Sequence, residues 1–256
     1  MTLKIEKPDD WGEDDLTSYL QTAFVNRLAT FEKKKKLFGQ LKRIDRCFLD
    51  IADNWLNPSS IAFNSPFLFM RCHASFRASC EHALATQFTD IFPQLRATLE
   101  YAAYALYIEK NPDAEVIWIK RHDSKESLKK VRNEFYFRRL VEVIAKYNGY
   151  IGDIYESLYE ATIAYGAHPN ERSITANLVI TESDQDTRYD QTYMHNDESI
   201  ITVGLLFTIQ AGLCSLEILQ EIFPERFELK GVRSKILNLR REVKYPIPPG
   251  GKTILD

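Results

Sequence analysis

Two Arg-x-x-x-Glu pairs are the side chains best placed to do chemistry in this chain. Arg77 and Glu81 lie in one segment rich in small residues, and Arg96 and Glu100 lie in the next. Residues four apart share one face of a helix, and the neighbouring alanines allow another helix to approach that face closely. We expect a polar network inside a helical bundle, where the pairs act as structural ion pairs or surround a polar pocket.

His82 follows Arg77 at Arg-x4-His spacing. An arginine can stabilise phosphate charge while a histidine transfers protons at an RNA 2'-hydroxyl. The spacing resembles the catalytic motif of HEPN ribonucleases, which are helical proteins. Arg188 and His195 satisfy a looser form of the motif in a stretch that is not helical, so the pattern is easily met by chance. A metal-independent ribonuclease that uses Arg77 and His82 is the alternative hypothesis, and only this hypothesis implies RNA as a partner.

Metal and cofactor chemistry finds no support in the motifs. Cys72, His73, Cys80 and His82 gather in one segment, but a single helix cannot direct these four side chains at one ion, and tight Cys-x2-4-Cys spacing is absent. Serine-nucleophile and phosphate-loop motifs are absent too. We expect no metal and no cofactor, and nothing specific decides whether the protein is an enzyme.

Helical periodicity dominates the elements that must position these residues. We expect a single all-α bundle of about eight helices, made of two N-terminal amphipathic helices within 1–64 that pack on a core domain at 65–245, and a tail at 246–256. Between 168 and 198 the pattern alternates, which predicts one short β-hairpin or extended arm. The apolar positions that carry this prediction are Leu16, Leu20, Phe24, Leu28 and Phe31 in the first helix, Leu37, Leu41, Ile44, Phe48, Ile51 and Trp55 in the second, and Ile174, Ala176, Leu178 and Ile180 in the arm.

Composition and charge set the compartment and limit the partners. The 256 residues are 45% hydrophobic with a net charge of -3, which is typical of a globular protein with no general attraction to nucleic acid or anionic lipid. Ser199 to Leu216 carries no charge, yet Gln210 within it and Glu217 after it favour a buried core helix over a membrane span. The acidic N-terminus lacks a secretory signal. We therefore expect a cytoplasmic protein that makes no membrane contact.

Basic residues gather on two helix faces, at 33–46 and 230–244. Such a face can bind phosphates, but charge opposite an apolar stripe is also what any surface helix requires. We favour solvated faces, with phosphate binding as the alternative.

Two longer segments carry a family resemblance. They are LRATLEYAAYALYIEKNPDAEVIWIKR, which contains Arg96 and Glu100, and YESLYEATIAYGAHPN, which contains His168. Together they resemble a bacterial all-helical family of unknown function, which is itself similar to HEPN-type and abortive-infection proteins. The chain departs from the family at Ala164, Tyr165 and Gly166, where the family commonly has a serine before its histidine loop.

The resemblance implies a helical fold and brings Arg96, Glu100 and His168 together. If a small polar ligand binds, we expect it among these three residues and Tyr165, although ion pairing and helix capping explain the same side chains. The favoured function is a binding or accessory module, with a role in defence as one form of it. Its partner would be another protein or a second copy of the chain.

Overall fold

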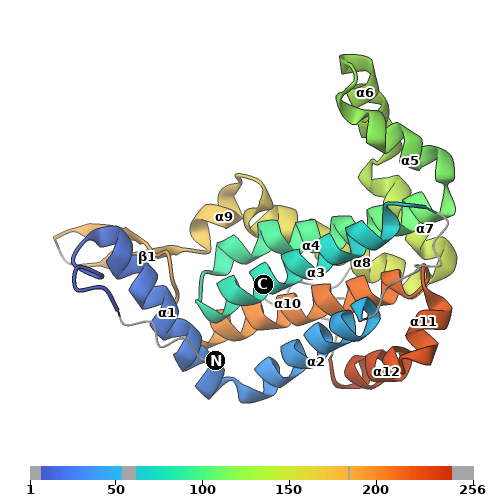
Figure 1. The fold of residues 1–256 in the computed structure, drawn as a ribbon. Coiled ribbons are helices and arrows are strands. Elements are labelled where there is room, and N and C mark those ends of the chain that lie inside the picture. Colours follow the sequence, from blue (N-terminus) through green and yellow to red (C-terminus); the bar gives the residue numbers. More distant parts are fainter. Residues whose placement is uncertain (1–6, 54–61, 184, 244–256) are drawn as a thin grey trace.

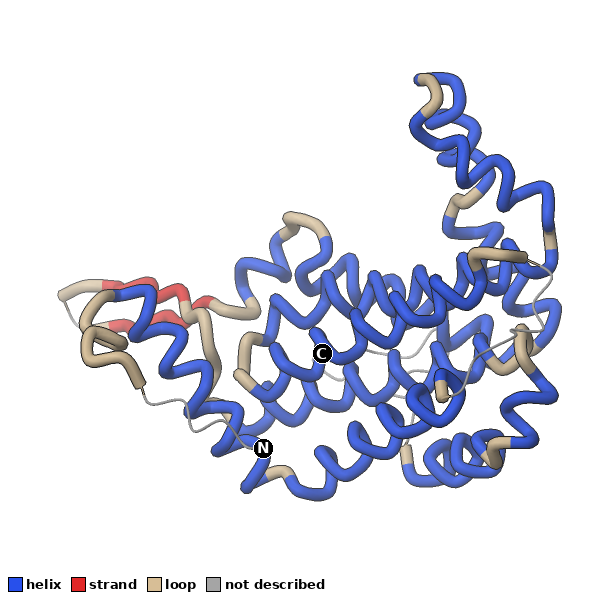
Figure 2. The backbone as a smooth tube through the Cα atoms, viewed as in Figure 1, coloured by secondary structure: helices blue, strands red, loops and turns tan. Residues whose placement is uncertain are grey.

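The computed structural model describes residues 7–53, 62–183 and 185–243. Over these residues the chain forms twelve α-helices and one two-stranded hairpin, which confirms the predicted all-α fold with a short hairpin (Figures 1 and 2). The helices outnumber the predicted eight because several are short. The shortest are α5 (Pro112–Ile119), α9 (Glu171–Thr175) and α11 (Pro224–Leu229).

Helix α10 (Glu198–Leu219) is the centre of the bundle, packed against α2 (Lys35–Ala52), α3 (Ser65–Leu84), α4 (Phe88–Lys110) and α8 (Gly149–Thr162) (Figure 1). It is the one helix in the described part of the chain that is long and apolar enough to cross a membrane, with a mean hydropathy of 1.8. However, 67% of that window is buried inside the protein. A helix that is apolar on all sides and surrounded by other helices has the character of a core helix.

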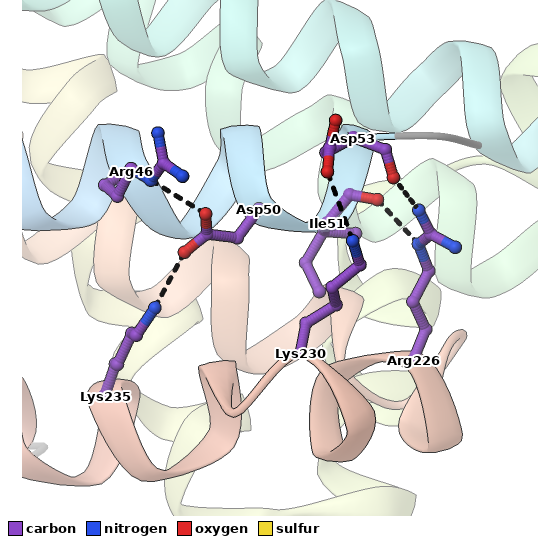
Figure 3. A network of polar contacts seen from close by, with 7 residues as sticks. All are labelled: Arg46, Asp50, Ile51, Asp53, Arg226, Lys230 and Lys235. Atoms are coloured by element: carbon purple, nitrogen blue, oxygen red, sulfur yellow. Dashed lines mark hydrogen bonds and ion pairs between the residues drawn. The ribbon is translucent and has the colours of Figure 1, made fainter.

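The C-terminal helices α11 and α12 (Val232–Glu242) are fastened to the end of α2 by charged side chains (Figure 3). Arg226 donates to the carbonyl oxygens of Ile51 and Asp53 at 2.6 and 2.5 Å. These carbonyls belong to the last turn of α2 and its cap, where a helix leaves acceptors unpaired and favours positive charge. Lys235 pairs with Asp50 at 2.7 Å.

Most of the basic residues on the two predicted basic faces find acidic partners within the protein. Lys33 and Lys34 both pair with Glu198, and Arg43 pairs with Glu242. Other pairs of this kind are Lys35–Glu32, Arg46–Asp50, Lys230–Asp53, Lys235–Asp50 and Arg240–Glu217. These faces therefore connect helices to one another.

The remaining elements lie at the two ends of the bundle. At one end, α5 and α6 (Lys125–Glu134) extend away from the body, while α7 (Phe137–Tyr147) packs on α8 (Figure 1). Toward the other end, β1 (Leu178–Glu182) and β2 (Thr187–Gln191) pair antiparallel, with Leu178 opposite Gln191. The alternating pattern also included Ile174 and Ala176, but these residues belong to α9 and its C-terminal cap.

The two N-terminal helices behave differently from each other. In α2, Leu41, Ile44, Phe48 and Ile51 are buried as predicted. In α1 (Asp15–Lys33), the predicted apolar stripe faces solvent instead of the core. Trp55 and the tail at 246–256 lie outside the described residues.

Candidate functional site

Arg96 is the centre of a polar cluster on α4. Its Nε donates to Oε1 of Glu100 at 2.9 Å, one turn further along the same helix. Its Nη2 donates to the hydroxyl of Tyr159 on α8 at 2.8 Å, and its Nη1 lies 2.5 Å from Nε2 of His168. We call these four residues the Arg96 cluster.

Tyr159 holds the guanidinium in place. Its hydroxyl accepts from Arg96 and donates to Glu100 at 2.9 Å, so the three side chains form a closed ring of hydrogen bonds. The Tyr159 ring stacks on Phe137 with centroids 4.2 Å apart. Burial, together with the negative charge of Glu100, raises the pKa of Tyr159, so this phenol keeps its proton at neutral pH and remains a donor.

A π-helical turn, Ile163–Ala167, delivers His168 to Arg96. The turn passes so close to α4 that a Cβ on Gly166 would lie 2.4 Å from the carbonyl oxygen of Thr89. After His168, the Asn170 side chain donates to the carbonyl oxygen of Ile163 at 2.6 Å and caps α9. Single π-helical turns of this kind occur frequently at functional sites.

The donors and acceptors of the cluster define what it can bind. Because a guanidinium can only donate, Nε2 of His168 is the acceptor in this contact. The described residues engage three of the five N–H groups of Arg96. The Arg96 and Glu100 side chains are 26% and 33% exposed, and His168 is exposed. Solvent therefore reaches a cation that is held in a fixed orientation beside the imidazole of His168.

Three of the four predicted ligand-binding residues come together in this cluster, and Tyr165 does not. The Tyr165 ring is buried against Phe88, Phe92 and Phe207. Tyr159 stands in its place, although sequence analysis did not select it. The spacing of Tyr155 and Tyr159 could have indicated this role, because the two residues lie one turn apart on the side of α8 that packs on the bundle.

Arg77 and His82 do not share a site. Two side chains five residues apart on an ideal helix point in directions about 140° apart. Arg77 and His82 accordingly have different partners. Arg77 binds Asp45 on α2 at 2.7 and 3.1 Å, whereas Nδ1 of His82 contacts Gln87 at 2.8 Å. A groove of about 200 Å³ beside Arg77 is lined by residues of α2 and α3 that do not include His82.

The first Arg/Glu pair also differs from the expected buried network. Arg77 and Glu81 are 54% and 59% exposed, and Glu81 pairs with Arg27 of α1 at 2.6 Å instead of with Arg77. Each residue therefore connects α3 to a different N-terminal helix. The second pair, Arg96 and Glu100, does bond along its own helix.

The cysteine and histidine segment of α3 is structural. His73 contacts Asp45 at 2.6 Å and stacks on Phe48, and burial lowers the pKa of this histidine. Across the described ranges, no group of three or more His, Cys, Asp or Glu side chains is arranged to hold a metal ion. Comparisons of the chain with family models, curated proteins and solved structures gave no match.

Proposed function

We propose that this protein is a helical binding module whose Arg96 cluster binds a small anionic group, a carboxylate or a phosphate. The observation that carries the proposal is the orientation of Arg96. Glu100 and Tyr159 hold its guanidinium from one side, while Nη1 contacts the exposed imidazole of His168 on the other. An arriving anion can replace His168 as the acceptor for Nη1, and arginine is the side chain best suited to two-point binding of such groups.

A second feature supports binding over simple scaffolding. The hydroxyl of Tyr155 is fully buried and finds no partner among the described residues, and its surroundings include Glu100, Tyr104 and Tyr159. A cluster that served only to join helices would be expected to satisfy its buried polar atoms. The buried side of the cluster thus keeps a donor that an ordered water or a ligand atom can use.

The ribonuclease hypothesis remains the alternative, with one change of residues. The Arg96 and His168 pair offers the chemistry first assigned to Arg77 and His82, because the two side chains are in contact and open to solvent. A phosphate bound by Arg96 would release Nε2 of His168, which could then accept the proton of an RNA 2'-hydroxyl. Arg96 would stabilise the charge that develops on the phosphate.

The proposal places the protein in the cytoplasm, as either a defence-related or a general binding module. All four cysteines are unpaired, and three of them are buried. Unpaired cysteines of this kind are typical of a reducing compartment.

The binding proposal is tested by calorimetry with inorganic phosphate, acetate and a nucleoside monophosphate. We expect Arg96→Lys to abolish binding, because lysine keeps the charge but loses the planar fork of donors. The matched control is Arg77→Lys, which alters an arginine that also holds a carboxylate, and it should leave binding unchanged. Equal binding by the parent and Arg96→Lys would contradict the proposal.

The ribonuclease alternative needs a separate assay with a mixed-sequence RNA and no metal ion. Cleavage lost in His168→Ala and kept in His82→Ala would favour catalysis at the Arg96 cluster. Cleavage kept in His168→Ala and lost in His82→Ala would assign the activity to Arg77 and His82. No cleavage by the parent, together with phosphate binding, would leave the protein as a binding module.

A further inference from the structure

Helix α1 exposes its large apolar side chains to solvent and turns its small and polar side chains toward the protein. Five of its large apolar residues recur every three or four positions and form one stripe, and each of the five is between 39% and 66% exposed. We call this set the α1 stripe: Leu16, Leu20, Phe24, Leu28 and Phe31. Figure 1 shows α1 at the edge of the molecule beside the β1–β2 hairpin, with its C-terminal end near the start of α10.

The side of α1 that faces the protein is small or polar. Ala23 and Thr30 are buried there, and Asn26 donates to the hydroxyl of Thr86 at 3.2 Å. Arg27 pairs with Glu81 at 2.6 Å, and Tyr19 accepts a hydrogen bond from Gln87. These contacts fix the orientation of α1, so the helix cannot rotate to bury its stripe. A contiguous apolar patch on a monomer is usually an interaction site.

We propose that the α1 stripe packs against the same stripe of a second copy of this chain, with the two helices antiparallel across a two-fold axis. The inference goes beyond the proposed ligand binding and uses none of its residues. The spacing of the stripe supports a self-pairing arrangement, because Phe24 lies at its centre with Leu20 and Leu28 four residues to either side. A two-fold axis at Phe24 therefore places Leu20 opposite Leu28 of the second copy, and the reverse.

The charges at the ends of α1 favour the antiparallel direction. The N-terminal end is acidic, whereas four lysines follow one another at the C-terminal end, and three of them pair with two carboxylates, Glu32 and Glu198. The acidic residues are Asp9, Asp10, Glu13, Asp14 and Asp15, and the lysines are Lys33, Lys34, Lys35 and Lys36. Antiparallel helices bring each acidic end to the basic end of the other copy, whereas parallel helices would bring like charges together.

The buried area suits a dimer of moderate affinity. A fully buried aromatic side chain covers about 150–250 Å², which sets an upper limit for each residue of the stripe. Because the five side chains are about half exposed, the stripe offers roughly 500 Å² of apolar surface per copy. A standard interface buries about 800 Å² per partner, and the polar flanks of α1 can supply the remainder. We expect dissociation in the micromolar range, because affinity depends on the quality of the central contacts more than on area.

The oligomeric state of the full chain tests the proposal by sedimentation equilibrium from low to high micromolar concentration. We expect a monomer–dimer equilibrium in which Phe24→Glu raises the dissociation constant by at least about 100-fold, since the change removes two central aromatic contacts and opposes two carboxylates. The control is Phe67→Glu on α3, because Phe67 is also 52% exposed. This variant should dimerise like the parent, and circular dichroism should show that both variants are folded.

Cysteine cross-linking tests the direction of the helices. Under oxidation, Phe24→Cys should form a disulfide-linked dimer, because the two-fold axis brings position 24 of both copies together. Leu16→Cys should not, because an antiparallel pair separates the two cysteines by about 24 Å along the helix axis. A linked dimer of Leu16→Cys would overturn the antiparallel arrangement. A chain that stays monomeric at high micromolar concentration would overturn the dimer, and its binding to lipid vesicles would assign the stripe to a membrane surface.

Discussion

Replacement of Gly166 by alanine tests whether the π-helical turn fixes the position of His168. An added Cβ would lie 2.4 Å from the carbonyl oxygen of Thr89 and 3.2 Å from its carbonyl carbon. Even close carbon–oxygen contacts in proteins stay near about 3.3 Å. The turn must therefore move away from α4 by roughly 1 Å, because the obstacle is backbone that no side-chain rotation can relieve.

The expected cost follows from this displacement. Overpacking of this kind costs about 1–3 kcal/mol. Gly166 has a non-helical backbone, with φ 165° and ψ -15°, so helix propensity does not enter, and the reduced freedom of the unfolded chain offsets at most about 1 kcal/mol. We expect a net loss of roughly 1–2 kcal/mol in the free energy of unfolding. His168 lies two residues further along, so the same shift would stretch its 2.5 Å contact with Arg96 beyond hydrogen-bond distance, which ends near 3.2 Å.

Urea unfolding followed by circular dichroism measures the first effect, and the imidazole NMR signals of His168 report the second. Gly39→Ala is the control, because a Cβ at this position in α2 meets no atom within 4 Å. That variant should gain about 0.5–1 kcal/mol from helix propensity. If Gly166→Ala is as stable as the parent and the His168 signals do not move, α4 does not constrain the turn.

Three further predictions concern charge and burial. Arg96→Met should lower the free energy of unfolding by about 1–2 kcal/mol, less than the 3–5 kcal/mol of a fully buried pair, because Glu100 is 33% exposed; a larger loss in urea unfolding would indicate a purely structural network. Burial lowers the pKa of His73 and of His195, so the unfolded chain, with histidines near 6.5, binds more protons in acid. The free energy of unfolding, measured by urea unfolding, should therefore be highest above about pH 7 and fall as the pH drops through 6.5 toward 5. His73→Gln should make this dependence of stability on pH less steep. Burial raises the pKa of Cys47 to about 11 and of Cys72 to about 12, so a thiol reagent at neutral pH should label neither cysteine before urea unfolds the chain.

Periodicity in the sequence predicted the helices whose apolar side is buried within the chain. Helix α10 is the clearest case, since an uncharged run followed by Glu217 indicated a helix covered on all sides. The same pattern predicted a stripe on α1, but periodicity reports only that a stripe exists and not which surface covers it. The polar contacts of Asn26 and Arg27 with α3 and the turn that follows it decide the orientation. Both contacts join residues far apart in the chain, which no local pattern can show.

The candidate site was predictable to the extent that one helix carries it. Arg96 and Glu100 lie one turn apart on α4, so their spacing allows the contact that they make. The same spacing in Arg77 and Glu81 gives no contact, because residues of α1 and α2 are their partners instead. Tyr159 and Tyr165 are six residues apart, which places them about 120° apart around an ideal helix. Only one of them could face α4 beside Arg96, and the choice depends on the packing of α8. The π-helical turn then changes the helical phase before His168, which spacing rules do not foresee.

The stripe and the Arg96 cluster can be tested independently in the same protein. The stripe variant Phe24→Glu changes a side chain that faces solvent on α1, whereas the cluster is built from α4, α8 and the residue after the π-helical turn. Phe24→Glu should therefore yield a monomer that still binds phosphate, and Arg96→Lys should yield a dimer that does not. If the monomeric variant also loses phosphate, the ligand requires both copies, and the binding site must include surface that only the dimer assembles.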